Sequence, residues 1–157
     1  MARSAMSEAQ IRIRRATPAD IDQMLTLLRA ADLPVDGVAT APGDYLVAAA
    51  ENGDIVALGG LESHGPDALL RSLAVAASHR NQGLGRRIFD RLWQRAEAER
   101  FSEIYLLTTT AADYFERLGF LRVARESAPG AIRLSREFSA ICPDSAVLMR
   151  RTAGGGA

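Results

Sequence analysis

The stretch LLRSLAVAASHRNQGLGRR, residues 69–87, decides how this chain folds. Its first seven residues are mostly apolar and predict a buried strand that ends near Val75. A short polar turn follows, and Gly83-Leu84-Gly85 begins a helix. Glycines let a backbone come close to a ligand, and the first amides of a helix have no partner within it. The stretch therefore predicts a strand, a loop and a helix, with a ligand site at the loop.

The charge of this loop predicts an anion as the ligand. Unpaired amides at the positive end of a helix dipole bind anions, and Arg80, Arg86 and Arg87 add positive charge. A P-loop is excluded because no Gly-Lys-Ser/Thr follows, and Ile88 stands where a dinucleotide-binding fingerprint has its third glycine. A pyrophosphate suits the loop, and a plain loop-to-helix junction with solvated arginines is the alternative.

Composition limits the function classes. The 157 residues suit one domain, expected at residues 11–151 between loose tails at 1–10 and 152–157. Lys+Arg and Asp+Glu are both 19, so no basic footprint for a nucleic acid is present. The apolar runs are far shorter than the ~20 residues of a membrane span, and the first ten residues show no apolar leader. We therefore expect a cytoplasmic protein with neither nucleic-acid nor membrane partners.

Cysteine and histidine are scarce. Cys142 is the one cysteine, so a disulfide within the chain is excluded, and we expect it to be a small buried apolar residue. His64 and His79 are the two histidines, too few for a histidine-rich metal site. His64 falls at a turn and His79 just before the loop. Both are interpreted as surface or capping residues rather than catalysts.

Periodicity and turn residues predict the remaining elements. Asn52-Gly53 predicts a tight hairpin with a positive φ at both residues. Helices are predicted to begin at 17–20 and to span 84–100, 111–118 and 131–141, the third of them ending at Gly119. Strands are predicted at 11–15, 45–50, 54–62, 68–75, 103–109, 121–125 and 145–150. This order indicates a mixed α+β fold built on a layered sheet.

Two motifs resemble those of one enzyme family. RNQGLG, residues 80–85, resembles the Gln/Arg-x-x-Gly-x-Gly/Ala signature of the GNAT acetyltransferase superfamily, and AADYFERLGF, residues 111–120, resembles its other familiar stretch. The likeness covers residues 11–125 in element order. The pattern LLRSLAV…LLTTTA…YFERLGF…CPDSAVLMRR further resembles the ArsN-type N-acetyltransferases of arsenic resistance. The resemblance implies a central mixed, mostly antiparallel sheet with helices on both faces, and an N-acetyltransferase.

The resemblance also implies acetyl-CoA as the cofactor. The backbones of Leu73 and Val75 would pair with the pantetheine arm like an added strand, and the amides of residues 82–86 would hold the pyrophosphate. Thr108 stands where many members have Asn, so its hydroxyl would make only part of that contact. The expected cofactor residues are Leu73, Ala74, Val75, Arg80, Asn81, Gln82, Gly83, Leu84, Gly85, Arg86, Thr108 and Phe115.

The sequence contains only some of the catalytic groups that this family commonly uses. The backbone N–H of Leu73 is expected to stabilise the oxyanion. Phe115 stands where members commonly have a tyrosine that protonates the leaving thiolate, and Tyr114 comes one residue earlier. One residue turns a helix by about 100°. Tyr114 is therefore either the acid or a rim aromatic, and the thiolate is a fair leaving group without one.

Charged residues on the strands are the candidates for substrate binding. Glu62 follows Val56, Leu58 and Gly60 on one strand face and is either the base that orients or deprotonates an amine, or an acid paired with Arg71. Arg71 is expected to share a face with Leu69, Leu73 and Val75 and to bind a substrate carboxylate, unless it serves a structural ion pair. The expected substrate residues are Glu62, Arg71, Ser72 and Arg133.

These residues favour direct acetyl transfer to a small, anionic, amino-acid-like amine. The ArsN resemblance suggests an arsenic-containing analogue. Two alternatives stay open: a non-catalytic acyl-CoA-binding module, favoured by Phe115, and a protein N-acetyltransferase. No metal is expected, and analogy with the family implies a homodimer.

Overall fold

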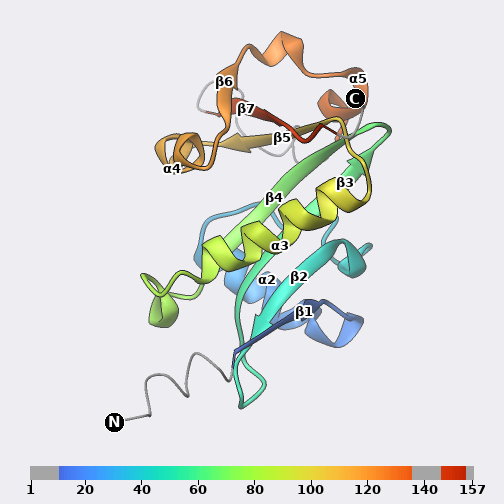
Figure 1. Ribbon diagram of the computed structural model, residues 1–157. Coiled ribbons are helices and arrows are strands. Elements are labelled where there is room, and N and C mark those ends of the chain that lie inside the picture. The colour runs from blue at the N-terminus through green and yellow to red at the C-terminus, as the bar shows by residue number, and fades with distance from the viewer. Residues whose placement is uncertain (1–10, 136–145, 155–157) are drawn as a thin grey trace. The chain divides into compact units, whose positions relative to one another are not determined.

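The computed structural model describes residues 11–135 and 146–154, and it has the mixed α+β architecture expected from the sequence (Figure 1). The sheet has seven strands in the order β1-β2-β3-β4-β5-β7-β6. β4 and β5 run parallel, whereas β1/β2, β2/β3, β5/β7 and β6/β7 are antiparallel. The strands are β1 (Arg12–Arg15), β2 (Tyr45–Ala49), β3 (Ile55–His64), β4 (Asp67–Val75), β5 (Glu103–Thr108), β6 (Leu121–Val123) and β7 (Val147–Thr152).

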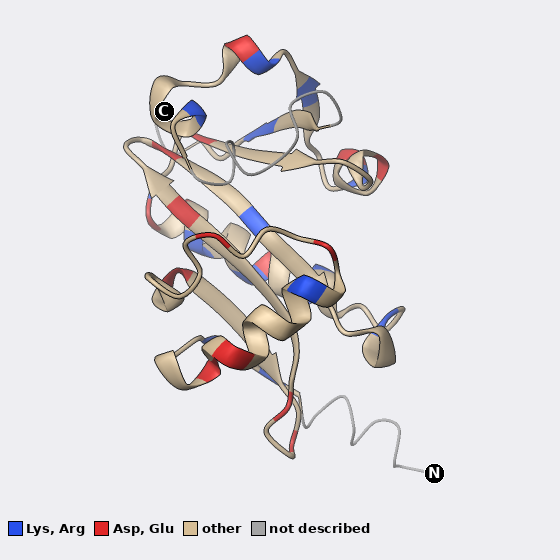
Figure 2. Ribbon diagram, turned by 180° about the vertical axis from the view of Figure 1, so that it is seen from behind, with Lys and Arg blue, Asp and Glu red and all other residues tan. Residues whose placement is uncertain are grey.

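Within the part of the chain that the structure describes, four α-helices and four 3-10 turns connect the strands. The α-helices are α2 (Ile21–Ala30), α3 (Leu84–Ala98), α4 (Ala112–Arg117) and α5 (Gly130–Arg133), and the 3-10 turns are η1 (Pro18–Asp20), η2 (Pro42–Asp44), η3 (Ala77–His79) and η4 (Arg125–Ser127). Charged residues are distributed over strands, helices and loops (Figure 2), as a chain with balanced charges allows. None of the helices within the described ranges is long and apolar enough to cross a membrane.

The chain divides into two compact units. The first comprises the described residues up to Gly60 together with Ser72–Leu92, and the second comprises Leu61–Arg71 and the described residues from Trp93 onward. The long strands β3 and β4 and the helix α3 run through both units.

In the first unit, helices lie on both faces of the sheet. Met24 and Leu28 of α2 pack with the strand residues Tyr45 and Leu58, all at most 1% exposed. On the other face, Gly59 makes room for α3, because a Cβ there would lie 2.8 Å from Cγ2 of Ile88. The predicted apolar stripe of α3 is confirmed: its residues Leu84, Ile88, Leu92 and Ala96 are at most 2% exposed.

The start of α2 is fixed by a charged cap. The carboxylate of Asp20 accepts a hydrogen bond from the backbone N–H of Thr17 over 2.8 Å and two from Nη1 and Nη2 of Arg14 over 2.7 and 2.9 Å. These hydrogen bonds lower the pKa of Asp20 to about 2, the bond from Arg14 contributing most. Pro18 stands in the first turn, where its missing N–H costs nothing.

The hairpin between β2 and β3 differs from the predicted turn. Gly53 has a φ of +93°, whereas Asn52 does not have a positive φ. The N–H of Ala50 donates to the carbonyl of Asp54 over 2.8 Å, and the pairing register shifts between Ala48 and Ala49. One left-handed glycine is sufficient because the bulge beside it supplies the twist that a two-residue turn takes from two such residues.

In the second unit, β5 pairs with β7 over six positions, and β7 pairs with β6 (Figure 1). Leu69, Tyr105, Ile132 and Leu148 are at most 4% exposed in its core, so the short helix α5 covers part of this sheet. Gly119 ends α4 with a φ of +94°, which confirms the predicted terminator.

Two predicted elements near the C-terminus differ in their bounds. The helix expected at 131–141 begins one residue earlier and is the single turn Gly130–Arg133, since Leu134 and Ser135 are not helical. Residues 136–145, which include Cys142, lie outside the described residues. The last strand covers Val147–Thr152 and so includes Thr152, which was expected in the tail.

Candidate functional site

The loop after β4 lies in the first unit and has an irregular backbone. β4 ends where the N–H of Ala76 donates to the carbonyl of Val56 over 2.8 Å. The 3-10 turn η3 follows, and α3 begins at Leu84. Asn81 and Gly83 have φ values of +64° and +78°. Alternation of left-handed and ordinary residues turns successive N–H groups toward one concavity, a geometry typical of anion-binding nests.

The amides of this loop are available to a ligand. The N–H of Arg87 donates to the carbonyl of Gly83 over 3.0 Å and is the first N–H of the helix to find a backbone partner. Among the described residues, no hydrogen bond uses the backbone N–H groups of residues 81–86. The loop therefore offers several donors at the positive end of a 15-residue helix.

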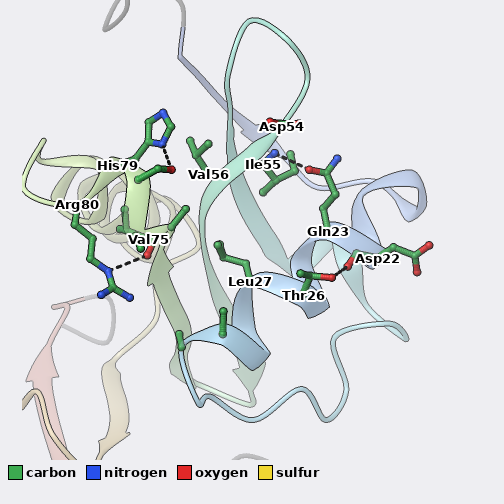
Figure 3. A pocket seen from close by; sticks show the side chains of 15 residues that line it. Asp22, Gln23, Thr26, Leu27, Asp54, Ile55, Val56, Val75, His79 and Arg80 are labelled. Atoms are coloured by element: carbon green, nitrogen blue, oxygen red, sulfur yellow. Dashed lines mark hydrogen bonds between the residues drawn. The ribbon is translucent and has the colours of Figure 1, made fainter.

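The loop arginines contribute unequally to the positive charge. Nε of Arg86 donates to Asp90 over 2.9 Å, so the neighbouring carboxylate balances that charge. Nε of Arg80 folds back to the carbonyl of Val75 over 3.3 Å, as Figure 3 shows. Arg87 is exposed at the first turn of α3. The backbone amides, and not a convergent cluster of guanidinium groups, are the main feature of the loop.

A cavity of about 520 Å³ lies beside this loop within the first unit. Figure 3 shows α2 on one side of it, with Gln23 and Leu27, and the end of β4 with His79 and Arg80 on the other. Oε1 of Gln23 accepts the N–H of Ile55 over 2.9 Å, and His79 contacts the hydroxyl of Ser78 over 2.8 Å. These polar side chains form hydrogen bonds within the protein. The cavity was not predicted from the sequence.

Ser72 interrupts the regular geometry of β4. It is 6% exposed and has a φ of +63°, in the left-handed region that few side-chain-bearing residues adopt. Before it, Arg71 bonds to Glu62; after it, Leu73 lies 3.1 Å from where a Cβ on Gly59 would be. Gly59 and Glu62 point to opposite faces of β3, because side chains alternate along a strand. The prediction that Arg71 and Leu73 share a face is therefore wrong, since the bend at Ser72 breaks the alternation.

In the second unit, three charged or polar side chains form a chain of contacts. Nη1 of Arg71 donates to Oε2 of Glu62 over 2.9 Å, and Nε2 of His64 lies 3.2 Å from Oε1 of the same carboxylate. The exposed fraction of the side chain is 0% for Arg71, 18% for Glu62 and 21% for His64. The sequence predicted the Glu62–Arg71 pair as one of two alternatives, but it did not predict that His64 contacts Glu62. The two-residue spacing of Glu62 and His64 could have indicated this contact, because it puts both side chains on one face of the strand.

The surroundings of Glu62 keep it ionised. Burial, the largest influence, raises the pKa of this carboxyl group, but the hydrogen bonds and charges of His64 and Arg71 together outweigh it. The pKa of Glu62 is therefore lower than that of an ordinary glutamate. A carboxylate of lowered pKa holds a positive neighbour in place well and is a weaker base.

The other predicted residues of the second unit lie at several places. The hydroxyl of Thr108 accepts the N–H of Ala111 over 2.9 Å and so helps to start α4. Phe115 is 8% exposed, with its ring edge-on to Tyr114 at 5.2 Å and to Phe120 at 5.9 Å between centroids. Tyr114 is half-buried, and Arg133 is exposed at the end of α5. Glu62 and Arg71 are thus the predicted substrate residues that are in direct contact.

A comparison with protein families matches this chain to one of them. Residues 42–122, just over half of the chain, match the acetyltransferase (GNAT) domain. The matched segment extends from the turn η2 to β6 and includes the strands β3 and β4 and the loop after β4.

Solved structures share the fold. N-acetylglutamate synthase from Neisseria gonorrhoeae, complexed with coenzyme A and L-arginine, is 18% identical with a TM-score of 0.76 over 90% of this chain, which spans 33% of the synthase's length. Rv2747 from Mycobacterium tuberculosis, in complex with CoA, is 21% identical with a TM-score of 0.76, over 90% of this chain and 98% of that one. The ribosomal-protein-S18-alanine N-acetyltransferase from Escherichia coli is 18% identical with a TM-score of 0.69, over 92% of this chain and 94% of that one.

Proposed function

The chain belongs to the GNAT acetyltransferase family, and we propose on that basis that it transfers acetyl from acetyl-CoA directly to the amine of a small, anionic, amino-acid-like compound. The family membership makes it an acetyltransferase that uses acetyl-CoA. The acceptor, the direct transfer and the residue roles are the proposal. The unpaired amides of residues 81–86 are the observation that supports it most.

The first unit would hold the coenzyme. The N–H groups of Gln82, Gly83, Leu84, Gly85 and Arg86 suit a diphosphate, because none donates within the described chain and two left-handed residues turn them to one side. The exposed side chains of Arg80 and Asn81 lie on the same loop.

The end of β4 completes the proposed coenzyme site. The backbone of residues 73–75 would pair with the pantetheine arm as an added strand does. The N–H of Leu73, directly after the bend at Ser72, would stabilise the developing oxyanion. The likeness to the family's motifs adds Thr108 and Phe115 to the proposed coenzyme residues.

Acetyl-CoA supplies an activated thioester, and the protein has to manage the protons. An ammonium group has no lone pair, so a proton must leave it before it attacks. Glu62, ionised and anchored by Arg71, would orient this ammonium through its charge. Tyr114, half-buried on α4, is the proposed donor to the leaving sulfur.

The proposed acceptor is small and carries an anionic group. Arg71 is committed to Glu62, so the exposed guanidinium of Arg133 is the better candidate for binding that group, with Ser72 near the reacting amine. The ArsN-like sequence pattern extends the proposal to an arsenic-containing amino-acid analogue. A cytoplasmic homodimer remains part of the proposal, on family analogy alone.

Release of free thiol from acetyl-CoA over a panel of amines tests this proposal. The panel contains amino acids, anionic amino-acid analogues, decarboxylated amines and short peptides. We expect turnover with the anionic amino acids, and Arg133→Gln should raise KM for them without changing that for decarboxylated amines. Preference for peptides would indicate a protein N-acetyltransferase, the activity in the name of the S18-alanine enzyme.

The non-catalytic alternative has one observation in its favour. Phe115, at the usual tyrosine position, is buried against Phe120 and has no proton to donate. Binding of acetyl-CoA without thiol release on any amine would support that alternative. Tyr114→Phe separates the two further, because it should slow turnover only if the hydroxyl protonates the sulfur.

A further inference from the structure

We propose that Arg87 and Arg91 bind the 3′-phosphate of coenzyme A, so that the protein selects acetyl-CoA over its 3′-dephosphorylated form. This inference rests on the proposed function and deepens it, because it assigns the third phosphate of the coenzyme to side chains outside the loop. Both arginines lie in the first unit, on the first two turns of α3.

The charge pattern of α3 changes at these two residues. Residues four apart on a helix are neighbours. Two arginines of α3 form an ion pair with an acid four residues later, Arg86–Asp90 over 2.9 Å and Arg95–Glu99 over 2.6 Å. Arg87 instead has Arg91 at that position. Both side chains are exposed, and neither has a hydrogen bond or an ion pair with any of the described residues.

A phosphate monoester supplies what this arginine pair lacks. Two like charges at this spacing repel each other and destabilise a helix, and a dianion between them removes the repulsion. A phosphate monoester carries a charge of about −1.5 to −2 at pH 7 and offers three acceptor oxygens. A guanidinium group binds such oxygens through two parallel hydrogen bonds. The pair therefore has the charge and the donors for the 3′-phosphate.

The place of the two arginines along the chain fits the order of groups in the coenzyme. The diphosphate of coenzyme A joins the pantetheine arm to the ribose, which carries the 3′-phosphate. In the proposed function, the end of β4 pairs with the pantetheine arm and the amides of residues 82–86 hold the diphosphate. Arg87 directly follows those amides, and Arg91 comes about 6 Å further along the helix axis. The next cations after the diphosphate site are thus these two.

The other arginines beside the loop are less suited to this phosphate. Asp90 balances the charge of Arg86. Nε of Arg80 donates to the carbonyl of Val75 over 3.3 Å (Figure 3), at the end of the strand that is proposed to pair with the pantetheine arm. Arg80 is therefore held at the pantetheine end of the proposed site.

Calorimetric titration with acetyl-CoA and with 3′-dephospho-acetyl-CoA tests the inference without turnover. We expect the wild-type protein to bind acetyl-CoA at least about tenfold more tightly, because hydrogen bonds between charged groups are strong. The double variant Arg87→Gln/Arg91→Gln should bind both forms with the affinity of the wild type for the dephosphorylated one. Arg80→Gln should keep the wild-type ratio of affinities. Arg15→Gln, a change of an exposed arginine on β1 of the same unit, is the control and should keep both affinities.

Unfolding of the coenzyme-free protein in urea gives a second readout. The double variant should be at least as stable as the wild type, because the repulsion between the two arginines is removed. A clear loss of stability would show that the arginines serve the helix itself, which contradicts the inference.

The titrations separate failure of the inference from failure of the proposed function. Equal affinities of the wild type for the two forms would overturn the inference and leave the proposed function standing, and so would a wild-type ratio in the double variant. Loss of the preference in Arg80→Gln alone would assign the phosphate to Arg80 instead. If the wild-type protein binds neither form, the proposed coenzyme site fails, and the inference fails with it.

Discussion

Nη1 of Arg71 lies 2.9 Å from Oε2 of Glu62, and no part of the arginine side chain is exposed. Nε of Arg86 lies 2.9 Å from Oδ1 of Asp90 on the surface of α3, with 62% and 50% of the two side chains exposed. The two ion pairs have the same length and differ in burial. The difference decides what each contributes to stability, because a buried charge that loses its partner has no water to replace it.

Arg71→Met should therefore destabilise the protein by about 3 kcal/mol, since it leaves the Glu62 carboxylate half-buried without its arginine. Asp90→Asn, which breaks the pair of equal length on the surface, should cost less than about 1 kcal/mol. Urea unfolding of both variants measures the two free energies. Equal losses would show that burial does not govern the Arg71–Glu62 pair.

Gly83→Val should weaken acetyl-CoA binding at least about tenfold, a change of about 1.4 kcal/mol. A side chain at this position has room, because no atom lies within 4 Å of an added Cβ. The obstacle is the φ of +78°, because valine disfavours the left-handed region. Gly53→Val is the matched control, with a φ of +93° and equally open space in the β2–β3 hairpin. Calorimetric titration with acetyl-CoA should separate them, and equal affinities would remove the loop from the proposed site.

The ion pair at the start of α2 predicts how stability depends on acid. Arg14 lowers the pKa of Asp20 to about 2, so the unfolded chain binds the proton more tightly than the folded one. The contribution is complete above about pH 4 and is lost as the pH falls toward 2. Because Arg14 is partly exposed, we expect on the order of 1–2 kcal/mol. Unfolding free energies between pH 2 and 5 should show a shallower slope for Asp20→Asn, and an unchanged slope would contradict this assignment.

Gly60→Ala should destabilise the first unit by about 2 kcal/mol through overpacking. An added Cβ would overlap the ring of Tyr45, a 1% exposed residue that cannot move without disturbing the α2 core. Gly43→Ala, where no atom lies within 4 Å, is the control. Thermal unfolding should separate the two variants, and Gly60→Ala at wild-type stability would show that the ring has room to shift.

The sequence by itself determined the order of the elements and the position of the glycine-containing loop before α3. The reason is that both depend on local rules: the apolar stripe of α3 follows from the helical repeat, and the ends at Gly83 and Gly119 follow from the freedom of glycine. These signals lie within a few residues of the features that they predict.

Tertiary structure decided between the two roles that the sequence left open for Arg71 and Glu62. The bend at Ser72 puts Arg71 on the face opposite to Leu73, and no periodic rule places a left-handed serine within a strand. Arg71 then meets Glu62, nine residues earlier on the neighbouring strand, and Glu62 meets His64. Spacing gives the face of a residue, but the register of two strands determines which charges come within bonding distance, and register depends on packing of the whole sheet.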